Sequence, residues 1–163
     1  MKINRYLFKK DGYVQEEDID FSHETFDPYH IRKINKAHVV ITGNDYDEIL
    51  LLNLKISYEV IGVCSYSLED VIYKSNISTS LSFSFEEEDE EIIHIDNPIF
   101  DIDQYVLGLI IADVPLRLIK KGAKLPSSGE GYRVITEDQY NEEQKNKTDP
   151  RWAALDNIDI DEN

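Results

Sequence analysis

A group of cationic side chains in the second half of the chain is the first candidate for binding chemistry. This basic cluster consists of Arg117, Lys120, Lys121 and Lys124. Lysine and arginine neutralise phosphates, so the cluster is a candidate contact for RNA, with Arg133 and Arg151 as further cations. The formal net charge of −16 opposes this contact. The cluster could therefore outweigh the overall charge only if the acidic side chains lie on the opposite face.

The acidic composition itself points to a different kind of partner. The chain has 33 Asp and Glu residues against 17 Lys and Arg residues, and every residue from 86 to 91 is acidic. A surface of this charge attracts a basic protein, and the attraction weakens at high salt. Two interpretations of residues 86–91 stay open: a docking surface, or a solvated loop that follows an aggregation-prone strand.

Catalytic and metal chemistry have no recognisable pattern in this sequence. Cys64 is the only cysteine, so neither a disulfide framework nor a multi-thiolate metal site can form. The four histidines show none of the paired spacings that zinc sites use. No serine lies in a nucleophile-elbow pattern. We therefore expect a protein that is not an enzyme and holds no metal or cofactor.

Targeting and membrane signals are also missing from the pattern of residues. The first residues lead into no apolar segment of the signal-peptide type. No apolar run approaches the length that spans a bilayer. The sequence thus predicts a cytoplasmic protein without a membrane partner.

One stretch, Asn76–Phe85, organises the predicted fold. Serines occupy every second position, and the positions between them hold Ile77, Thr79, Leu81, Phe83 and Phe85. Side chains alternate between the two faces of a strand, so this spacing predicts a strand with one apolar face and one small polar face. Counted from Val71, the strand has about fifteen residues and would measure roughly 50 Å if straight, so it must twist or coil.

Two further strands and one helix complete the predicted core. Residues 38–42 and 49–63 read as strands, and the polar alternation of the second favours an antiparallel sheet. An apolar stripe from Ile102 to Ile110 predicts a helix over 102–112, with Asp101 as its N-cap. The expected fold is α+β: a twisted antiparallel sheet or half-barrel covered by one main helix.

The last part of the chain is expected to form an extension with little core of its own. Thr136 and Gln139 have capping-box spacing at the start of a polar helix over 137–146. Asp149 and Pro150 then predict the start of a short final helix. We accordingly expect a core domain over 1–125 and a partly mobile extension over 126–163.

Several segments resemble one protein family, in the order expected for it. They are Cys64–Leu68, Asp113–Arg117, Leu125–Asp138 and Asp149–Leu155. Together they resemble the YceD family of bacterial and plastid proteins, named for accumulation of large-subunit (23S) ribosomal RNA. The family-motif residues are Cys64, Asp149, Pro150 and Arg151, and the ending that starts with Asp149, Pro150 and Arg151 is the most specific piece of the resemblance.

Two departures limit what this resemblance transfers. Tyr66 stands where the family usually has an arginine, so no role of that arginine carries over. Many members also have a cysteine cluster before the Asp-Pro-Arg element, whereas Lys124–Gln139 contains no cysteine. The resemblance is thus to a low-GC bacterial branch without that cluster, and it implies no metal.

The resemblance implies a non-enzymatic factor for synthesis, processing or stability of large-subunit ribosomal RNA. Three hypotheses remain for how it acts. It could bind a basic ribosomal protein or assembly factor, which the charge of −16 favours. It could contact ribosomal RNA directly through the basic cluster. It could also be an RNA-processing enzyme, although no catalytic constellation supports that reading.

Overall fold

The computed structural model describes residues 1–9, 12–46, 48–85 and 92–145. They fall into two compact units, residues 1–122 and residues 123–163. Every strand and the helix α1 belong to the first unit, and the helix α2 belongs to the second.

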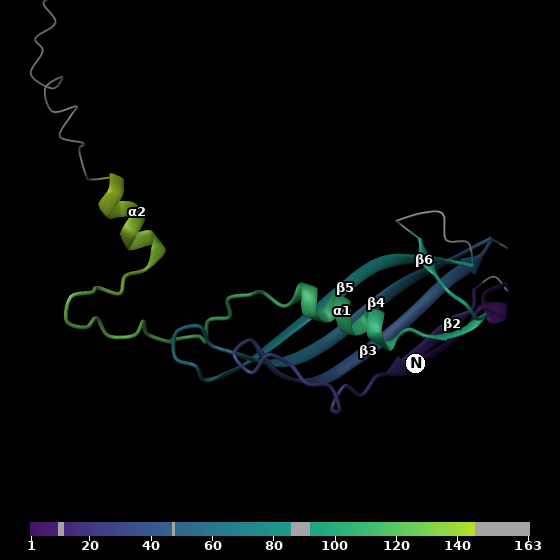
Figure 1. Cartoon of the computed structure of the whole chain (residues 1–163), viewed down its shortest axis with the longest axis horizontal. Helices are drawn as coiled ribbons and strands as arrows, with labels where there is room; N and C mark the ends of the chain where they lie inside the picture. The colour runs from purple at the N-terminus through teal and green to yellow at the C-terminus, as the bar shows by residue number, and fades with distance from the viewer. Residues whose placement is uncertain (10–11, 47, 86–91, 146–163) are drawn as a thin grey trace, which may run out of the picture. The chain divides into compact units, whose positions relative to one another are not determined.

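The first unit is built on a five-stranded sheet whose strands follow the order β2-β3-β4-β5-β6 (Figure 1). Neighbouring strands are antiparallel except β5 and β6, which are parallel. The sheet is open and does not close into a barrel. The predicted α+β class with an antiparallel sheet is therefore confirmed. The strands are β2 Val14–Asp18, β3 Ile31–Asp45, β4 Ile49–Val63, β5 Asp70–Ser84 and β6 Ile93–His94.

The central strand β4 shows the alternation that the sequence predicts. Its exposed side chains include Asn53, Lys55 and Ser57. The alternate residues point into the core and are at most 3% exposed: Leu50, Leu52, Leu54, Ile56, Tyr58 and Val60. One face of the sheet is consequently polar and the other apolar, as is usual for an antiparallel sheet that packs on one side only.

The strand β5 confirms the predicted strand, with graded burial along its apolar face. Phe83 is fully buried, and its ring lies 4.8 Å from that of Phe100 and 5.6 Å from that of Tyr105. Ile77 and Leu81 are only partly buried. Phe85 follows the end of β5 and is 43% exposed. The guanidinium of Arg5 lies over its ring, 5.0 Å from the ring centre.

The strand β3 is longer than the predicted 38–42 at both ends. It begins at Ile31, and it runs through Gly43 to Asp45 because Gly43 lies inside the strand and not in a turn. A Cβ atom on Gly43 would stand 2.2 Å from the backbone oxygen of Leu51, so the glycine permits close approach of β4. The reversal comes later, where the Tyr46 N–H donates to the Ile49 oxygen at 2.9 Å. Glycine-asparagine pairs usually mark turns, and here strand pairing overrides that signal.

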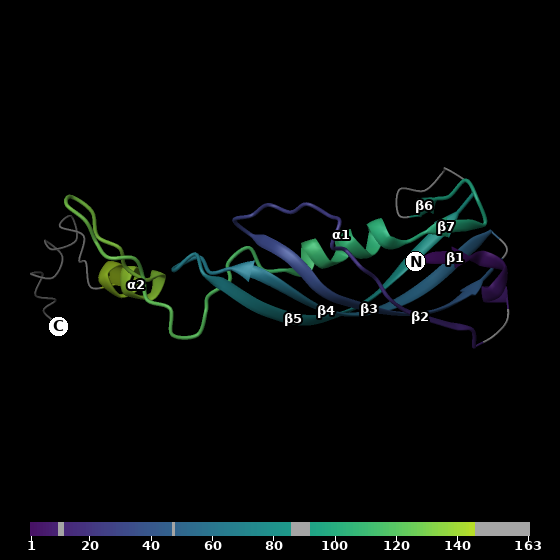
Figure 2. The same cartoon turned by 90° about the horizontal axis from the view of Figure 1, so that it is seen from below.

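The helix α1, Asp103–Asp113, lies over the apolar face of the sheet (Figure 2). Val106, Leu107 and Ile110 are its buried residues. The N-cap residue is Ile102, one position later than predicted, while the Asp101 carboxylate accepts the Asp103 N–H at 2.9 Å. Ahead of the helix, β7 (Ile99–Asp101) pairs with β1 (Lys2–Asn4), which leads into the 3-10 helix η1 (Arg5–Lys9).

The second unit contains α2, Glu137–Lys145, which has no buried residue. The predicted capping box is present at its start. The Gln139 N–H donates to the Thr136 hydroxyl at 3.1 Å, and the Thr136 N–H donates to the Gln139 side-chain oxygen at 3.0 Å. The short helix predicted from Asp149 and Pro150, and the acidic residues 86–91, lie outside the described residues.

Phe83→Ala should lower the free energy of unfolding by about 3–5 kcal/mol. The substitution removes the ring that contacts Phe100 and Tyr105 and leaves a cavity in its place. Ser82→Ala, on the polar face of the same strand, should change it by less than about 0.5 kcal/mol. Urea unfolding followed by circular dichroism measures both. Equal effects of the two substitutions on the free energy of unfolding would show that the apolar face of β5 does not form part of the core.

Candidate functional site

The two upstream segments of the family resemblance meet in the first unit. Cys64 follows the end of β4 and forms a parallel bridge with Leu118, which follows α1. The Ser65 N–H donates to the Leu118 oxygen at 2.8 Å, and the Cys64 N–H donates to the Glu69 oxygen at 2.8 Å. Residues 64–69, here called the Cys64 turn, therefore lie beside the chain that carries part of the basic cluster.

The sulfur of Cys64 joins these two segments. The side chain is buried, and its Sγ accepts the backbone N–H of Lys120 at 3.4 Å and that of Ser67 at 3.5 Å. Hydrogen bonds to sulfur favour the thiolate, so the pKa of Cys64 falls to about 7; the Lys120 N–H is the largest cause and the Ser67 hydroxyl the second. Burial of the sulfur opposes this shift only in part. In this setting Cys64 acts as a hydrogen-bond acceptor between segments.

Two cations of the basic cluster have partners in the Cys64 turn. The Arg117 guanidinium lies 5.1 Å from the centre of the Tyr66 ring and donates to its hydroxyl at 2.8 Å. The Lys120 ammonium lies 3.3 Å from the carboxylate of Glu69. That ion pair, together with the Ser67 hydroxyl, lowers the pKa of Glu69. These contacts are exposed, so each contributes little to stability.

The remaining cations of the sequence prediction lie elsewhere. Lys121 is exposed in the first unit, whereas Lys124 belongs to the second unit and is also exposed. Arg133, also in the second unit, pairs with Glu143. Arg151 lies outside the described residues, as do Asp149 and Pro150. The structure thus brings together Arg117, Lys120 and Cys64.

The end of α1 is held against the sheet by a polar contact at the margin of the core. The Tyr58 hydroxyl donates to the Asp113 carboxylate at 2.5 Å. Burial, and then this hydrogen bond, raises the pKa of Tyr58 well above its ordinary value. Sequence reasoning missed this pair, although a tyrosine on the core face of a strand generally needs a partner for its hydroxyl.

Because Gly62 has no side chain, the segment after α1 can pack closely against β4. A Cβ atom there would lie 2.3 Å from the Cδ1 of Leu118 and 3.2 Å from the backbone oxygen of His30. The His30 ring reaches the Pro115 oxygen at 3.1 Å, so the start of β3 borders the same place. Close packing around Gly62 positions Arg117 and Lys120 beside the Cys64 turn.

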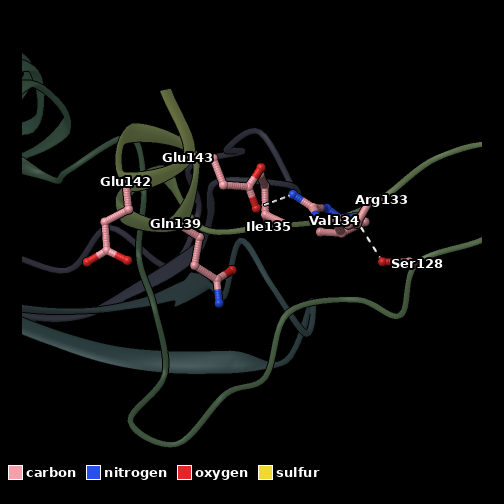
Figure 3. Close-up of a pocket in the computed structure, with 7 residues that line it drawn as sticks. All are labelled: Ser128, Arg133, Val134, Ile135, Gln139, Glu142 and Glu143. Carbon is pink, nitrogen blue, oxygen red and sulfur yellow. Dashed lines mark hydrogen bonds and ion pairs between the residues drawn. The ribbon is translucent and has the colours of Figure 1, made fainter. Parts of the chain in front are cut away.

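A hollow of about 460 Å³ lies in the second unit. It is lined by Ser128, Arg133, Val134, Ile135, Gln139, Glu142 and Glu143. Figure 3 shows the Arg133 guanidinium turned to Glu143, and the Val134 N–H donating to the Ser128 hydroxyl at 3.0 Å. The single cation of this hollow is already paired with a carboxylate, and a second carboxylate, Glu142, lies in the lining. We assign no binding chemistry to it.

Metal coordination has no candidate site within the described ranges. No three His, Cys, Asp or Glu side chains in those ranges come together so that they could hold a metal ion. Over the same part of the chain, no helix is both long and apolar enough to cross a membrane.

The titration of Cys64 gives a pH dependence whose sign follows from its lowered pKa. The folded pKa of about 7 lies below the ordinary value of 9.0, so the thiolate contribution is complete above about pH 9 and is lost as pH falls through about 7. Relative to Cys64→Ser, the native chain should therefore gain stability as pH rises through this window. Ultraviolet absorbance of the thiolate should show a midpoint near pH 7. A midpoint at or above about pH 9 would show that the backbone N–H groups of Lys120 and Ser67 do not lower the pKa of Cys64.

Gly62→Ala should lower the free energy of unfolding by about 1–3 kcal/mol, since Leu118 must move away from the new methyl group. Gly108→Ala is the matched control, because a Cβ atom on this residue of α1 meets nothing within 4 Å. The control should stabilise the protein by up to about 1 kcal/mol through helix propensity. Thermal and urea unfolding compare the two. A neutral Gly62→Ala would contradict the proposed packing.

Comparisons with known proteins bear out the resemblance. A family model described as "Large ribosomal RNA subunit accumulation protein YceD" matches residues 52–159, a range that includes the Cys64 turn and the basic cluster. The chain is 28% identical over 158 residues to the uncharacterized protein YlbN of Bacillus subtilis (strain 168), covering 91% of this chain and 89% of that protein. No solved structure gives a significant match. Because the family match extends over more than half of its residues, this chain belongs to the YceD family.

Proposed function

We propose that this protein supports the accumulation of large-subunit (23S) ribosomal RNA as a non-enzymatic factor that binds a basic ribosomal protein or assembly factor. The observation that carries the proposal is the formal net charge of −16 in a chain of 163 residues. A field of this sign raises the rate at which a basic protein is encountered and disfavours contact with phosphate. The compartment we propose is the cytoplasm.

The family description supports the ribosomal part of this proposal. It names accumulation of the large ribosomal RNA, and the matched residues 52–159 include β5, α1 and all but the first three residues of β4. A factor can raise the amount of an RNA without touching it, by holding or delivering a protein that the RNA needs. The acidic charge suits that indirect role.

Two of the four cations in the basic cluster already have partners within the chain. The Arg117 guanidinium is engaged with Tyr66, and the Lys120 ammonium with Glu69. An RNA phosphate would have to compete with the Glu69 carboxylate for Lys120. Direct RNA contact through Arg117, Lys120, Lys121 and Lys124 remains the alternative function, and RNA processing by catalysis the second alternative.

Affinity purification of the tagged chain from bacterial cells, with and without RNase, separates these functions. We expect a basic ribosomal protein or assembly factor to stay bound after RNase treatment, and to be released as salt rises because charge attraction is screened. Mass spectrometry identifies the bound protein. The charge-reversal variant Lys121→Glu should not weaken that binding, because the loss of a cation does not reduce the attraction of an acidic chain for a basic partner.

Two results would contradict the proposal. Binding that disappears with RNase, and with Lys121→Glu, would favour the RNA alternative. Cleavage of ribosomal RNA by the pure protein, abolished by a chelator, would favour the enzymatic one.

A further inference from the structure

The outer edge of β5 is open along most of its length. On one side β5 pairs with β4 from Asp70 to Ser84 without a register shift. On the other side β6 pairs only with Phe83 and Ser84. Between Val71 and Leu81, no described residue forms a strand pair with this edge. Figure 1 shows β5 at one margin of the sheet with β6 reaching only its far end.

The hydrogen bonds at the end of β5 show which backbone groups face this edge. The Tyr46 N–H donates to the Ile49 oxygen, so the backbone groups of Ile49 face β3. Its partner on β5, Ser84, therefore faces away from β4, and the Ser84 oxygen accepts the Ile95 N–H at 2.8 Å. Backbone groups alternate in direction along a strand. The N–H and C=O groups that point to the open edge belong to Ile72, Lys74, Asn76, Ser78 and Ser80.

This edge lacks the features that usually protect a sheet from a further strand. Natural edges are typically short, charged, bulged or interrupted by proline. The strand β5 has 15 residues with no proline or glycine. Its one cation, Lys74, pairs with Glu59 on β4 at 2.6 Å. The opposite edge strand, β2, is short and carries Glu16, Glu17 and Asp18.

Partly buried apolar side chains follow the same edge on the core side. Tyr73, Ile77 and Leu81 pack against the core but remain partly exposed, whereas the equivalent residues of β4 are fully covered. They recur at every fourth residue, so they form one row along β5. The side chains of an added strand would cover this row and bury the parts of Tyr73, Ile77 and Leu81 that are now exposed.

We propose that the β5 edge binds an extended segment of a basic protein as an additional strand of the sheet. The proposal rests on the proposed function and names the surface and the form of the partner. Main-chain hydrogen bonds would supply the affinity, and the row of Tyr73, Ile77 and Leu81 would receive alternate side chains of the segment. A second copy of this chain is the less favoured occupant, because two chains that each carry a charge of −16 repel one another.

The decisive variant is Ser78→Pro, with Ser78→Thr as its matched control. Proline removes an N–H that points to the open edge and leaves the bonds to β4 intact, whereas threonine keeps that N–H and suits a strand. The probe is the RNA-free protein extract of a bacterial large ribosomal subunit, applied to each immobilised variant. We expect a basic protein, identified by mass spectrometry, to bind the native chain and Ser78→Thr equally. Its affinity for Ser78→Pro should fall by about tenfold, as expected for one or two lost hydrogen bonds.

Hydrogen exchange on the native chain gives a second measurement that needs no variant. Binding should slow exchange of the amides of Lys74, Asn76, Ser78 and Ser80, while those of the intervening residues, already bonded to β4, should change little. This alternation is the signature of strand addition and would not arise from binding to the polar face.

Each contrary result has a separate meaning. Equal binding to a folded Ser78→Pro, or no alternating protection, overturns the edge proposal and leaves the proposed function standing. Failure of the native chain to retain any basic protein overturns the proposed function as well. A dimer in sedimentation that Ser78→Pro converts to a monomer would assign the edge to a second copy and overturn the choice of a basic partner.

Discussion

Burial of the apolar face of β4 is the constraint from which the rest of the first unit follows. Six side chains along this strand are essentially inaccessible to water, so both neighbouring strands and a covering helix are required. Burial of this kind is the main favourable contribution to folding. Among the described residues of the first unit, α1 is the only α-helix, and it lies over one face of the sheet. The other face must then be polar, and it is.

The same constraint places the Cys64 turn. The last residue of α1, Asp113, accepts a hydrogen bond from the hydroxyl of Tyr58 on β4, and this contact fixes the end of the helix against the sheet. In the chain that follows, Leu118 packs against Gly62 and forms a bridge with Cys64. Two segments far apart in the sequence thereby become one local structure. This explains how residues that resemble family motifs can serve packing and still present Arg117 and Lys121 to solvent.

Sequence reasoning reached those features that depend on neighbours along the chain. The alternation of β5, the stripe of α1 and the capping box of Thr136 and Gln139 are local patterns, and each is present. The strand predicted over residues 38–42 continues through Gly43, because the close approach of β4 and not a turn requires that glycine. The contact of Arg117 with Tyr66 and the open edge of β5 depend on tertiary pairing and strand order. Periodicity contains no information about either.

Charge is the link between this fold and its proposed role. The sheet and helix provide a stable frame, while the excess of acidic residues determines which partners approach it. The most direct test is the association rate of the chain with the basic protein captured after RNase treatment, measured by stopped flow over a range of salt. The account predicts that the rate falls by about tenfold or more between about 20 and 200 mM salt, with little change in the dissociation rate. An association rate that does not change with salt would contradict it.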